Sequence, residues 1–152
     1  MQALYFEEYD KGMVFETGRR TVTDYDISSF VGLCSYSGPI WMDLDYVGQS
    51  KYYSGRLAPG MLVLSLAEGL IINTGMMEDR GLALMELTPK FEKPVLAGDT
   101  IYAENVVTDL HLTSKGDRGV ITTEVAILTT GGKRAISYKA VRMVKARAFD
   151  AE

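Results

Sequence analysis

Few side chains in this sequence can move a proton or attack a substrate at neutral pH. The chain contains one histidine, His111, and one cysteine, Cys34, and nothing in their spacing indicates a paired nucleophile and base. His111 falls on an alternating, strand-like pattern, so we predict a position on the surface of a sheet. Cys34 completes the apolar face of an expected helix, so we predict a buried thiol. Carboxylates are the remaining candidates for acid–base chemistry.

Three carboxylates stand out by their surroundings. Asp43 and Asp45 lie in a long segment without regular periodicity, and Glu68 interrupts an apolar run. Ser65 precedes Glu68 by one helical turn on the same face. A carboxylate in such a place could activate a water molecule. The alternative for Glu68, which we favour, is a position at a polar edge of the helix or in a pair with a basic residue.

The elements that must position these residues begin with a short helix and a long loop. Thr23 is a candidate N-cap, with Asp26 three residues later. An apolar stripe with helical spacing follows at Ile27, Phe30, Val31 and Cys34. The pattern predicts a helix that ends near residue 35. Glycines and prolines then recur without a period up to residue 59, which predicts a long loop, either functional or disordered, with about one helical turn at 43–47.

An apolar helix and a run of strands make up the rest. Pro59 opens the segment 60-GMLVLSLAEGLIINTG-75, which is apolar nearly all round, so we expect an enclosed helix that stops at Gly75. Strand patterns occupy 82–91, 101–114, 119–130 and 133–146, and residues 13–23 read as a strand pair or a strand bent at Gly18. An enclosed helix followed by consecutive antiparallel strands predicts an α+β fold, most simply a curved sheet wrapped around the helix.

Composition and charge argue against several classes of partner. Of the 152 residues, 47% are hydrophobic and 24% are charged, and the formal net charge is −4. This ordinary globular balance argues against nucleic acid or an anionic membrane as the main partner. We expect a single domain over residues 1–152.

Other sequence features bear on compartment and cofactors. The stretch 1-MQALYFEEYDKG-12 carries acids where an export signal carries positive charge, and the apolar run around Glu68 is shorter than the roughly 20 residues that cross a bilayer. A single cysteine permits no intrachain disulfide, which suits the cytoplasm. The chain contains no G-x-G-x-x-G, Walker, H-E-x-x-H or C-x-x-C pattern, so we expect no metal and no nicotinamide or nucleotide cofactor.

Three ordered blocks of the sequence resemble the MaoC-like dehydratase family. The stretch 30-FVGLCSYSGPIWMDLDYV-47 follows the family pattern F-A-x-L-T/S-G-D-x-N-P-I-H-x-D-x-x-Y-A. The stretch 55-GRLAPGMLVLSLAEGL-70 is similar to G-R-I-A-H/P-G-M-L-x-x-S-L-x-x-G-L, and 91-FEKPVLAGDTI-101 is similar to F-x-x-P-V-x-x-G-D-T-L. The resemblance spans about residues 13–144.

The resemblance implies a fold, a ligand and an assembly. The family consists of hotdog proteins and includes (R)-specific enoyl-CoA hydratases, which implies an acyl-CoA thioester as partner, with coenzyme A as part of the substrate. Because family members commonly build the pocket between subunits, it also implies a homodimer or larger homo-oligomer. The thioester carbonyl would lie against the Gly60 N–H. Arg56 would reach a phosphate of coenzyme A or, as we favour, brace the loop by pairing with a carboxylate.

The departures from the family pattern fall on its catalytic pair. In the family, an Asp and a His hold the water that adds across the double bond, and Tyr36 and Trp41 take those positions in an ungapped alignment. An alignment with a gap deletes the Asp and still places Trp41 at the His. A tyrosine with a pKa of about 10 and an indole that only donates are poor bases. We therefore expect hydration to be lost or severely weakened, unless Asp43 or Asp45 substitutes.

Two alternative functions remain open beside hydratase-type thioester binding, which we rank first because the family blocks are complete. Glu68 lies nine residues after Pro59, at the place of the catalytic carboxylate in hotdog thioesterases with an H-G-G-x(6)-E/D pattern, and Ser65 would then lie beside the substrate. The H-G-G itself is missing. In the third hypothesis, Tyr36 and Trp41 line the pocket of a non-catalytic ligand-binding subunit.

Overall fold

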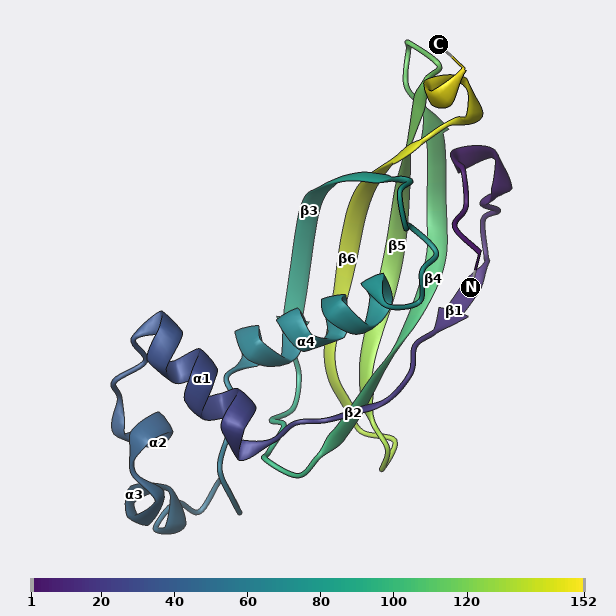
Figure 1. Ribbon diagram of the computed structural model, residues 1–152. Coiled ribbons are helices and arrows are strands. Elements are labelled where there is room, and N and C mark those ends of the chain that lie inside the picture. The colour runs from purple at the N-terminus through teal and green to yellow at the C-terminus, as the bar shows by residue number, and fades with distance from the viewer. Residues whose placement is uncertain (1, 152) are drawn as a thin grey trace.

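A six-stranded antiparallel sheet forms the body of the molecule, which the computed structural model describes over residues 2–151 (Figure 1). The strands are β1 (Val14–Glu16), β2 (Arg20–Thr21), β3 (Gly81–Phe91), β4 (Thr100–Leu112), β5 (Arg118–Thr129) and β6 (Arg134–Lys145). Their order across the sheet is β1-β4-β5-β6-β3, and β2 also pairs with β4. β1 and β3 are therefore the edge strands of the sheet, and β3 is the longer of the two.

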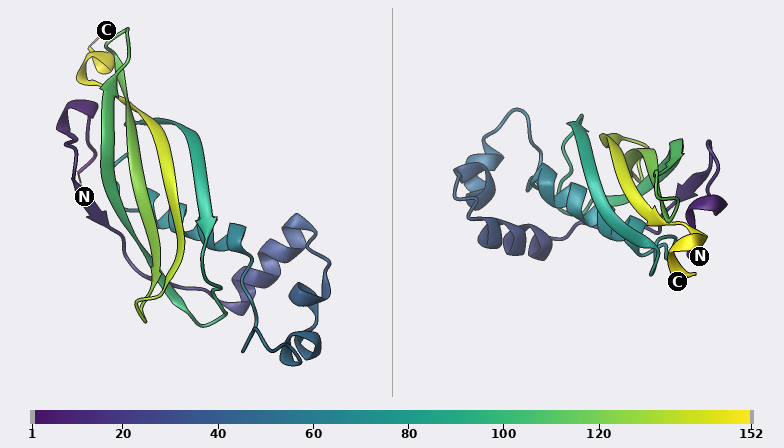
Figure 2. Two further views of the ribbon diagram at one scale, coloured as in Figure 1. Left: turned by 180° about the vertical axis from the view of Figure 1, so that it is seen from behind. Right: turned by 90° about the horizontal axis from the view of Figure 1, so that it is seen from above.

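Helices lie at both ends of the sheet and across one of its faces (Figure 1). They are η1 (Phe6–Glu8), α1 (Asp24–Cys34), α2 (Pro39–Met42), α3 (Leu44–Gly48), α4 (Gly60–Ile72) and η2 (Arg147–Asp150), where η denotes a 3₁₀ helix. Helix α4 crosses one face of the curved sheet, whereas α1 to α3 lie beyond its N-terminal end and away from the sheet (Figures 1 and 2). The segment that resembles a catalytic loop therefore lies beside the N-terminal end of α4, where Phe30, Tyr36 and Trp41 pack against the core.

Alternating burial explains how the strands hold α4. In β4, Ile101 and Ala103 turn inward and are buried, while their neighbours in the strand are partly exposed. They belong to one apolar cluster with Ala67 and Ile71 of α4. Each of the two isoleucines, Ile101 and Ile71, stabilises the fold by about 1.5–3 kcal/mol through its burial. The predicted α+β arrangement of a sheet around a helix is confirmed.

The strands match the predicted ranges, but some pairings differ from the expectation. Val14 of β1 lies opposite Val106, and Arg20 of β2 lies opposite Ile101, so both short strands pair with β4. The prediction of a strand bent near Gly18 is therefore confirmed. The alternative prediction, that the two segments pair with each other, is wrong. β3 pairs with β6 and not with β4, its successor in the sequence. Residues 92–99 carry the chain across the sheet, so sequence order and sheet order differ.

Helix α1 begins at the predicted cap. The Thr23 hydroxyl accepts a hydrogen bond from the Asp26 N–H at 3.1 Å, and the Asp26 carboxylate accepts one from the Thr23 N–H at 2.9 Å. This reciprocal pair is a capping box. Burial raises the pKa of the Asp26 carboxyl, but hydrogen bonds from Thr23 and Arg20 outweigh that effect and hold the pKa below its usual value.

The apolar stripe of α1 is only partly buried. Ile27 and Val31 are buried and Phe30 packs against the same core, as predicted. Cys34 is exposed, so the predicted buried thiol is wrong. The reason is that the C-terminal end of α1 extends past the core, where no other element covers the last position of the stripe.

The segment between α1 and α4 contains two short helices where the sequence predicts one turn. The predicted turn at 43–47 is confirmed as α3. Asp43 caps it, because one carboxylate oxygen accepts from the backbone N–H groups of Asp45 and Tyr46 at 2.9 and 3.0 Å. Helix α2 was not predicted, since four residues are too few to show a helical period.

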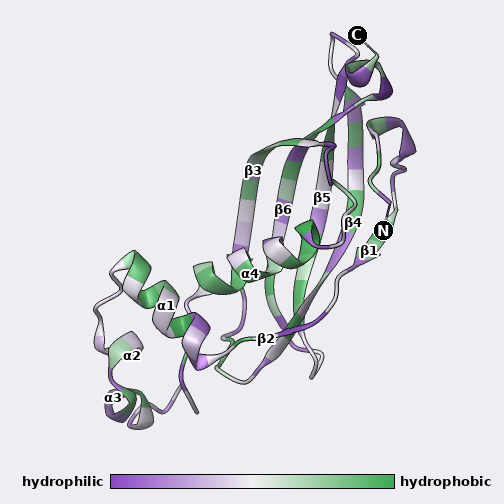
Figure 3. Ribbon diagram, in the orientation of Figure 1, coloured by the Kyte–Doolittle hydropathy of each residue, from purple (hydrophilic) through white to green (hydrophobic). Residues whose placement is uncertain are grey.

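Helix α4 has the predicted bounds but is not enclosed. It starts directly after Pro59 and ends before Gly75. Met61 is 48% exposed and Ile72 is 63% exposed, with Ser65 between them on the same face. The expectation of an enclosed helix is therefore wrong for this face of the single chain. Figure 3 shows apolar colouring on α4 and on the beginning of β3.

Helix α4 is 13 residues long. Across residues 2–151, no helix combines the length and the apolar content needed to cross a membrane.

Candidate functional site

The N-terminus of α4 opens into a cavity of about 340 Å³. A bridge between Leu57 and Leu96, and a hydrogen bond from the Ala58 N–H to the Val95 carbonyl at 2.9 Å, fix the chain that leads into the helix. The N-cap is Pro59, whose side chain cannot accept a hydrogen bond. The first N–H groups of a helix have no acceptor within it and carry its positive dipole end. They form a place where a carbonyl oxygen can be held.

Aromatic side chains form much of the wall of this cavity. Trp41, Tyr53 and Phe91 line it together with Gly60 and Val63. The Phe91 ring lies directly on the helix end, because a Cβ added at Gly60 would come within 2.7 Å of two ring carbons. Only glycine fits at this point, because the ring occupies the space that a side chain would need.

Tyr36 and Trp41 pack together in an aromatic cluster. The centroids of their rings are 5.7 Å apart, and Tyr36 makes an edge-on contact with Phe30 of α1 at 5.7 Å. Aromatic pairs at this distance attract each other beyond the area that they bury. The sharp exit from α1 produces the cluster: Ser35 adopts a positive φ of 57°, and the Tyr36 N–H donates to the Val31 carbonyl at 3.0 Å. Of the two residues, Trp41 lies in the wall of the cavity at Gly60.

The two loop aspartates lie elsewhere. Asp43 uses its carboxylate to cap α3, and both Asp43 and Asp45 are exposed. Within residues 2–151, the lining of the cavity at Gly60 contains neither of them. The structure thus brings Trp41 to Gly60 but does not bring these two carboxylates there.

Arg56 pairs with a carboxylate, as we favour from the sequence. Its Nη1 lies 3.2 Å from a carboxylate oxygen of Asp24, at the start of α1, and 3.5 Å from the Asp24 carbonyl oxygen. This contact joins the loop to α1. Because the Asp24 side chain is largely exposed, the pair contributes little to stability, about 0–1 kcal/mol.

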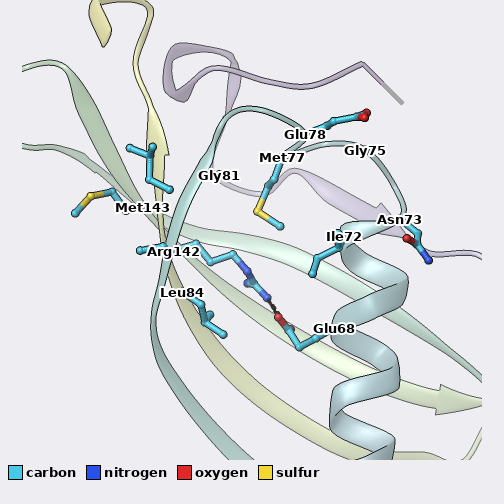
Figure 4. Close-up of a pocket in the computed structure, with 12 residues that line it drawn as sticks. Glu68, Ile72, Asn73, Gly75, Met77, Glu78, Gly81, Leu84, Arg142 and Met143 are labelled. Atoms are coloured by element: carbon cyan, nitrogen blue, oxygen red, sulfur yellow. Dashed lines mark hydrogen bonds and ion pairs between the residues drawn. The ribbon is translucent and has the colours of Figure 1, made fainter. Parts of the chain in front are cut away.

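Glu68 is held in a buried network on the other half of α4 (Figure 4). Arg142 of β6 donates from Nη2 to both carboxylate oxygens of Glu68, at 2.6 and 2.8 Å. Arg142 is only 5% exposed, and its Nη1 donates to the Thr123 hydroxyl at 3.1 Å. The Tyr138 hydroxyl donates to Glu68 as well. The pair with a basic residue, which we favour for Glu68 from its sequence context, is confirmed.

Burial and the neighbouring carboxylate act on Tyr138 in the same direction. Desolvation, followed by the negative charge of Glu68 and the hydrogen bond to it, raises the pKa of the Tyr138 hydroxyl far above its usual value. The hydroxyl therefore stays protonated and remains a donor to Glu68. Each member of the network has at least one hydrogen-bond partner within it, as is usual for polar groups among apolar side chains.

A larger cavity, of about 620 Å³, lies beside this network. It runs between α4 and the beginning of β3, and its walls are mainly apolar, with Ile72, Leu84 and Met143 among them (Figure 4). Glu68 and Arg142 line it too. Eight residues of helix separate Gly60 from Glu68, or about 12 Å along the axis, so the two cavities are distinct places.

The remaining candidate residues belong neither to the aromatic cluster of Tyr36 and Trp41 nor to the Glu68 network. Ser65 is exposed on α4 and donates to the Met61 carbonyl one turn back at 2.8 Å. His111 is exposed near the end of β4, as predicted. Within residues 2–151, no group of three or more His, Cys, Asp or Glu side chains lies close enough together to hold a metal ion.

Sequence reasoning missed Arg142, Tyr138 and Thr123. A signal for the first two was present, because Ile136, Tyr138, Ala140, Arg142 and Val144 alternate along one face of β6. An arginine on a face that otherwise reads as buried needs a carboxylate. Glu68, the one acid within the apolar helix, was the available partner.

Known proteins resemble this chain along most of its length. The model of the MaoC like domain family matches residues 8–130. An (R)-specific enoyl-CoA hydratase of Rhodospirillum rubrum is 29% identical over 143 residues, which cover 94% of this chain and 93% of that protein.

Solved structures share the fold. A MaoC-like dehydratase from Rhodospirillum rubrum superposes with a TM-score of 0.81 at 21% identity, over 95% of this chain and 99% of that chain. A conserved hypothetical protein of Mycobacterium tuberculosis with a double hotdog fold superposes with a TM-score of 0.83 at 19% identity, over 95% of this chain and 44% of that chain. The predicted hotdog fold is confirmed.

Proposed function

This chain belongs to the MaoC like domain family, and we propose that it binds an acyl-CoA thioester with the thioester carbonyl at the N-terminus of α4. The observation that carries the proposal is that Gly60, the first residue of α4, lines a cavity of about 340 Å³ at a helix end without a side-chain cap. Uncapped N–H groups and the helix dipole stabilise negative charge on a carbonyl oxygen. The aromatic wall formed by Trp41, Tyr53 and Phe91 suits the apolar acyl group.

We propose further that hydration of the bound thioester is severely weakened. Tyr36 and Trp41 pack on each other where the family resemblance places an acid–base pair. Neither a neutral phenol nor an indole accepts a proton readily near neutral pH. Asp43, the nearest substitute in the sequence, uses its carboxylate to cap α3. Binding without rapid water addition is the behaviour that these contacts support.

The environment of Glu68 argues against thioester hydrolysis by that residue. Both carboxylate oxygens accept hydrogen bonds from Arg142, and Tyr138 donates to one of them. These three hydrogen bonds occupy three of the roughly four acceptor positions of the carboxylate, so little of it is free to activate water. The distance of about 12 Å along the helix from Gly60 further separates this carboxylate from a carbonyl held there.

The test is incubation of the purified protein with short and medium 2-enoyl-CoA thioesters, followed by mass spectrometry and by titration calorimetry on the same panel. We expect measurable binding and little gain of one water. Rapid hydration would contradict the weakened chemistry and direct attention to Asp43 and Asp45. Release of free coenzyme A would show that the thioester is hydrolysed, and Glu68 would again be the candidate base for that reaction. If none of the thioesters in the panel binds to the protein, the proposed function is overturned.

Two glycine variants localise the binding. Gly60→Ala should weaken thioester binding by about tenfold or more, or 1.4 kcal/mol, because the new methyl group collides with Phe91 and displaces the ring into the cavity. Gly55→Ala is the matched control: its added Cβ would meet Leu96 at 3.7 Å, an ordinary contact. Equal affinities for the two variants would place the thioester elsewhere.

We also propose that two copies of the chain associate through α4 and β3. The long edge strand β3 pairs with one neighbour only, and Leu84 and Met85 are about half exposed on it. Exposed apolar edge strands invite pairing with another chain. The open face of α4, with Met61 and Ile72, adjoins it. A light-scattering mass of two chains at micromolar concentration is expected, and a mass of one chain would contradict the association.

A cytoplasmic location accords with this function. Cys34 is exposed and unpaired, and a free surface thiol persists best in a reducing compartment. Cell fractionation with an antibody against the chain tests the location, and recovery outside the cytoplasmic fraction would contradict it.

A further inference from the structure

One side chain lines two cavities. The cavity at Gly60, of about 340 Å³, and a second cavity, of about 410 Å³, have Trp41 as their shared lining residue. The second cavity lies between α1 and α2, and Val31, Tyr36 and Met42 contribute to its lining. The indole of Trp41 therefore contributes to the walls of both spaces.

Contacts on several sides hold Trp41 in place. The Tyr36 ring packs against it with centroids 5.7 Å apart. The backbone N–H of Trp41 donates to the Gly38 carbonyl at 2.9 Å, which closes the first turn of α2. The indole also packs against the main apolar core. Because its backbone is hydrogen-bonded and its indole packs against the Tyr36 ring, Trp41 is suited to form a fixed boundary of a cavity.

The second cavity suits a hydrocarbon chain. Its lining exposes more apolar than polar surface, and Val31, Tyr36 and Met42 supply apolar atoms. The polar contributors are three serines and Arg56, and Arg56 already pairs with Asp24. Space of this kind favours methylene groups, because each buried CH₂ improves binding by about fourfold.

We propose that Trp41 sets the length of the acyl chain that the protein accepts, by closing the cavity at Gly60 against the second cavity. The ligand class is accordingly a short-chain acyl thioester, whose acyl group ends at the indole. This inference rests on the proposed binding of thioesters at Gly60. Removal of the indole joins the two cavities and makes room for a longer chain.

The test is titration calorimetry with saturated acyl-CoA thioesters from acetyl to decanoyl. For the wild-type chain, affinity should rise by about fourfold per methylene and stop rising at a short chain. For Trp41→Ala, the rise should continue for at least two further methylenes, so that the longer chain binds roughly fifteenfold tighter than in the wild type. Leu44→Ala is the matched control, since Leu44 is an exposed apolar residue close in sequence that lies outside the lining of both cavities.

The outcomes separate this inference from the proposed function. An unchanged stopping point in Trp41→Ala, with binding intact, overturns the role of Trp41 alone. Failure of the wild-type chain to bind any thioester overturns both. Because the chain has a single tryptophan, its emission provides a second measurement in the wild type. Short acyl-CoA thioesters should change that emission and coenzyme A alone should not; an unchanged emission on binding would remove Trp41 from the wall.

Discussion

At the scale of single residues, Glu68 illustrates how burial decides the role of a carboxylate. It lies on an apolar helix, and its charge is compensated by Arg142, which is almost fully buried. A buried ion pair contributes little net stability relative to apolar residues of similar size, but removal of one partner leaves an unpaired charge inside the protein. Glu68 is therefore expected to matter for folding more than for chemistry.

The first prediction concerns this pair. Glu68→Leu should lower the free energy of unfolding by about 3 kcal/mol, because it leaves Arg142 unpaired. The double variant Glu68→Leu/Arg142→Met should recover more than half of that loss. Urea denaturation of the wild type, both single variants and the double variant gives the four free energies. Additive losses would show that the two side chains do not depend on each other.

The second prediction concerns Tyr138 at alkaline pH. Its pKa in the folded protein is raised above the usual value, first by burial and then by Glu68. The unfolded chain therefore loses this proton first, so the stabilising contribution is complete below about pH 10 and declines above it. Thermal unfolding between about pH 8 and pH 11 should show a steeper loss of stability in the wild type than in Tyr138→Phe. Tyr9, whose pKa burial raises to about 12, remains in both proteins; parallel curves would contradict the prediction.

At the scale of elements, α1 shows how a local cap positions a distant site. The capping box of Thr23 and Asp26 fixes where the helix begins. Eleven residues later the helix ends, and the positive φ at Ser35 turns the chain so that Tyr36 meets Phe30 and Trp41. The aromatic wall beside Gly60 thus depends on the register of α1.

The third prediction tests this helix. Thr23→Ala should lower the free energy of unfolding by about 1 kcal/mol, because the N–H of Asp26 loses its acceptor. Ser29→Ala, an exposed position inside the same helix, should change the free energy by less than about 0.5 kcal/mol. Chemical denaturation of both variants measures the difference. Equal effects would mean that the cap does not stabilise α1.

At the scale of the whole molecule, the single chain leaves one apolar side uncovered. β3 is exposed along most of its length, and the adjoining face of α4 exposes Met61 and Ile72. The cavity of about 620 Å³ lies between these elements. A group of exposed apolar side chains on neighbouring elements is typical of a surface that another chain covers. This arrangement is the basis for the proposed association of two copies.

The fourth prediction tests this surface. Ile72→Lys should shift the protein from two chains to one at micromolar concentration, because it places a charge in the middle of the apolar side. Leu33→Lys is the control, since Leu33 is 84% exposed on α1 and does not line the cavity between α4 and β3. Sedimentation velocity of both variants gives the masses. A two-chain mass for Ile72→Lys would move the interface to another surface.

Features that depend on neighbouring residues were predictable from the sequence. The cap at Thr23, the start of α4 after Pro59 and the four long strands follow from local hydrogen bonding and periodicity. The three sequence blocks also indicated the family, which the match over residues 8–130 confirms. The burial of Cys34 was predicted wrongly, because a helical stripe shows which side is apolar but not where the covering core ends.

Contacts between distant segments were decided only by the tertiary structure. Glu68 and Arg142 are 74 residues apart, and the sequence could assign Glu68 a basic partner without identifying it. The position of β3 beside β6, and of Trp41 between two cavities, likewise depends on the path of the chain through space. Periodicity records which side of an element is buried, whereas the partner that buries it is chosen by the packing of the whole fold.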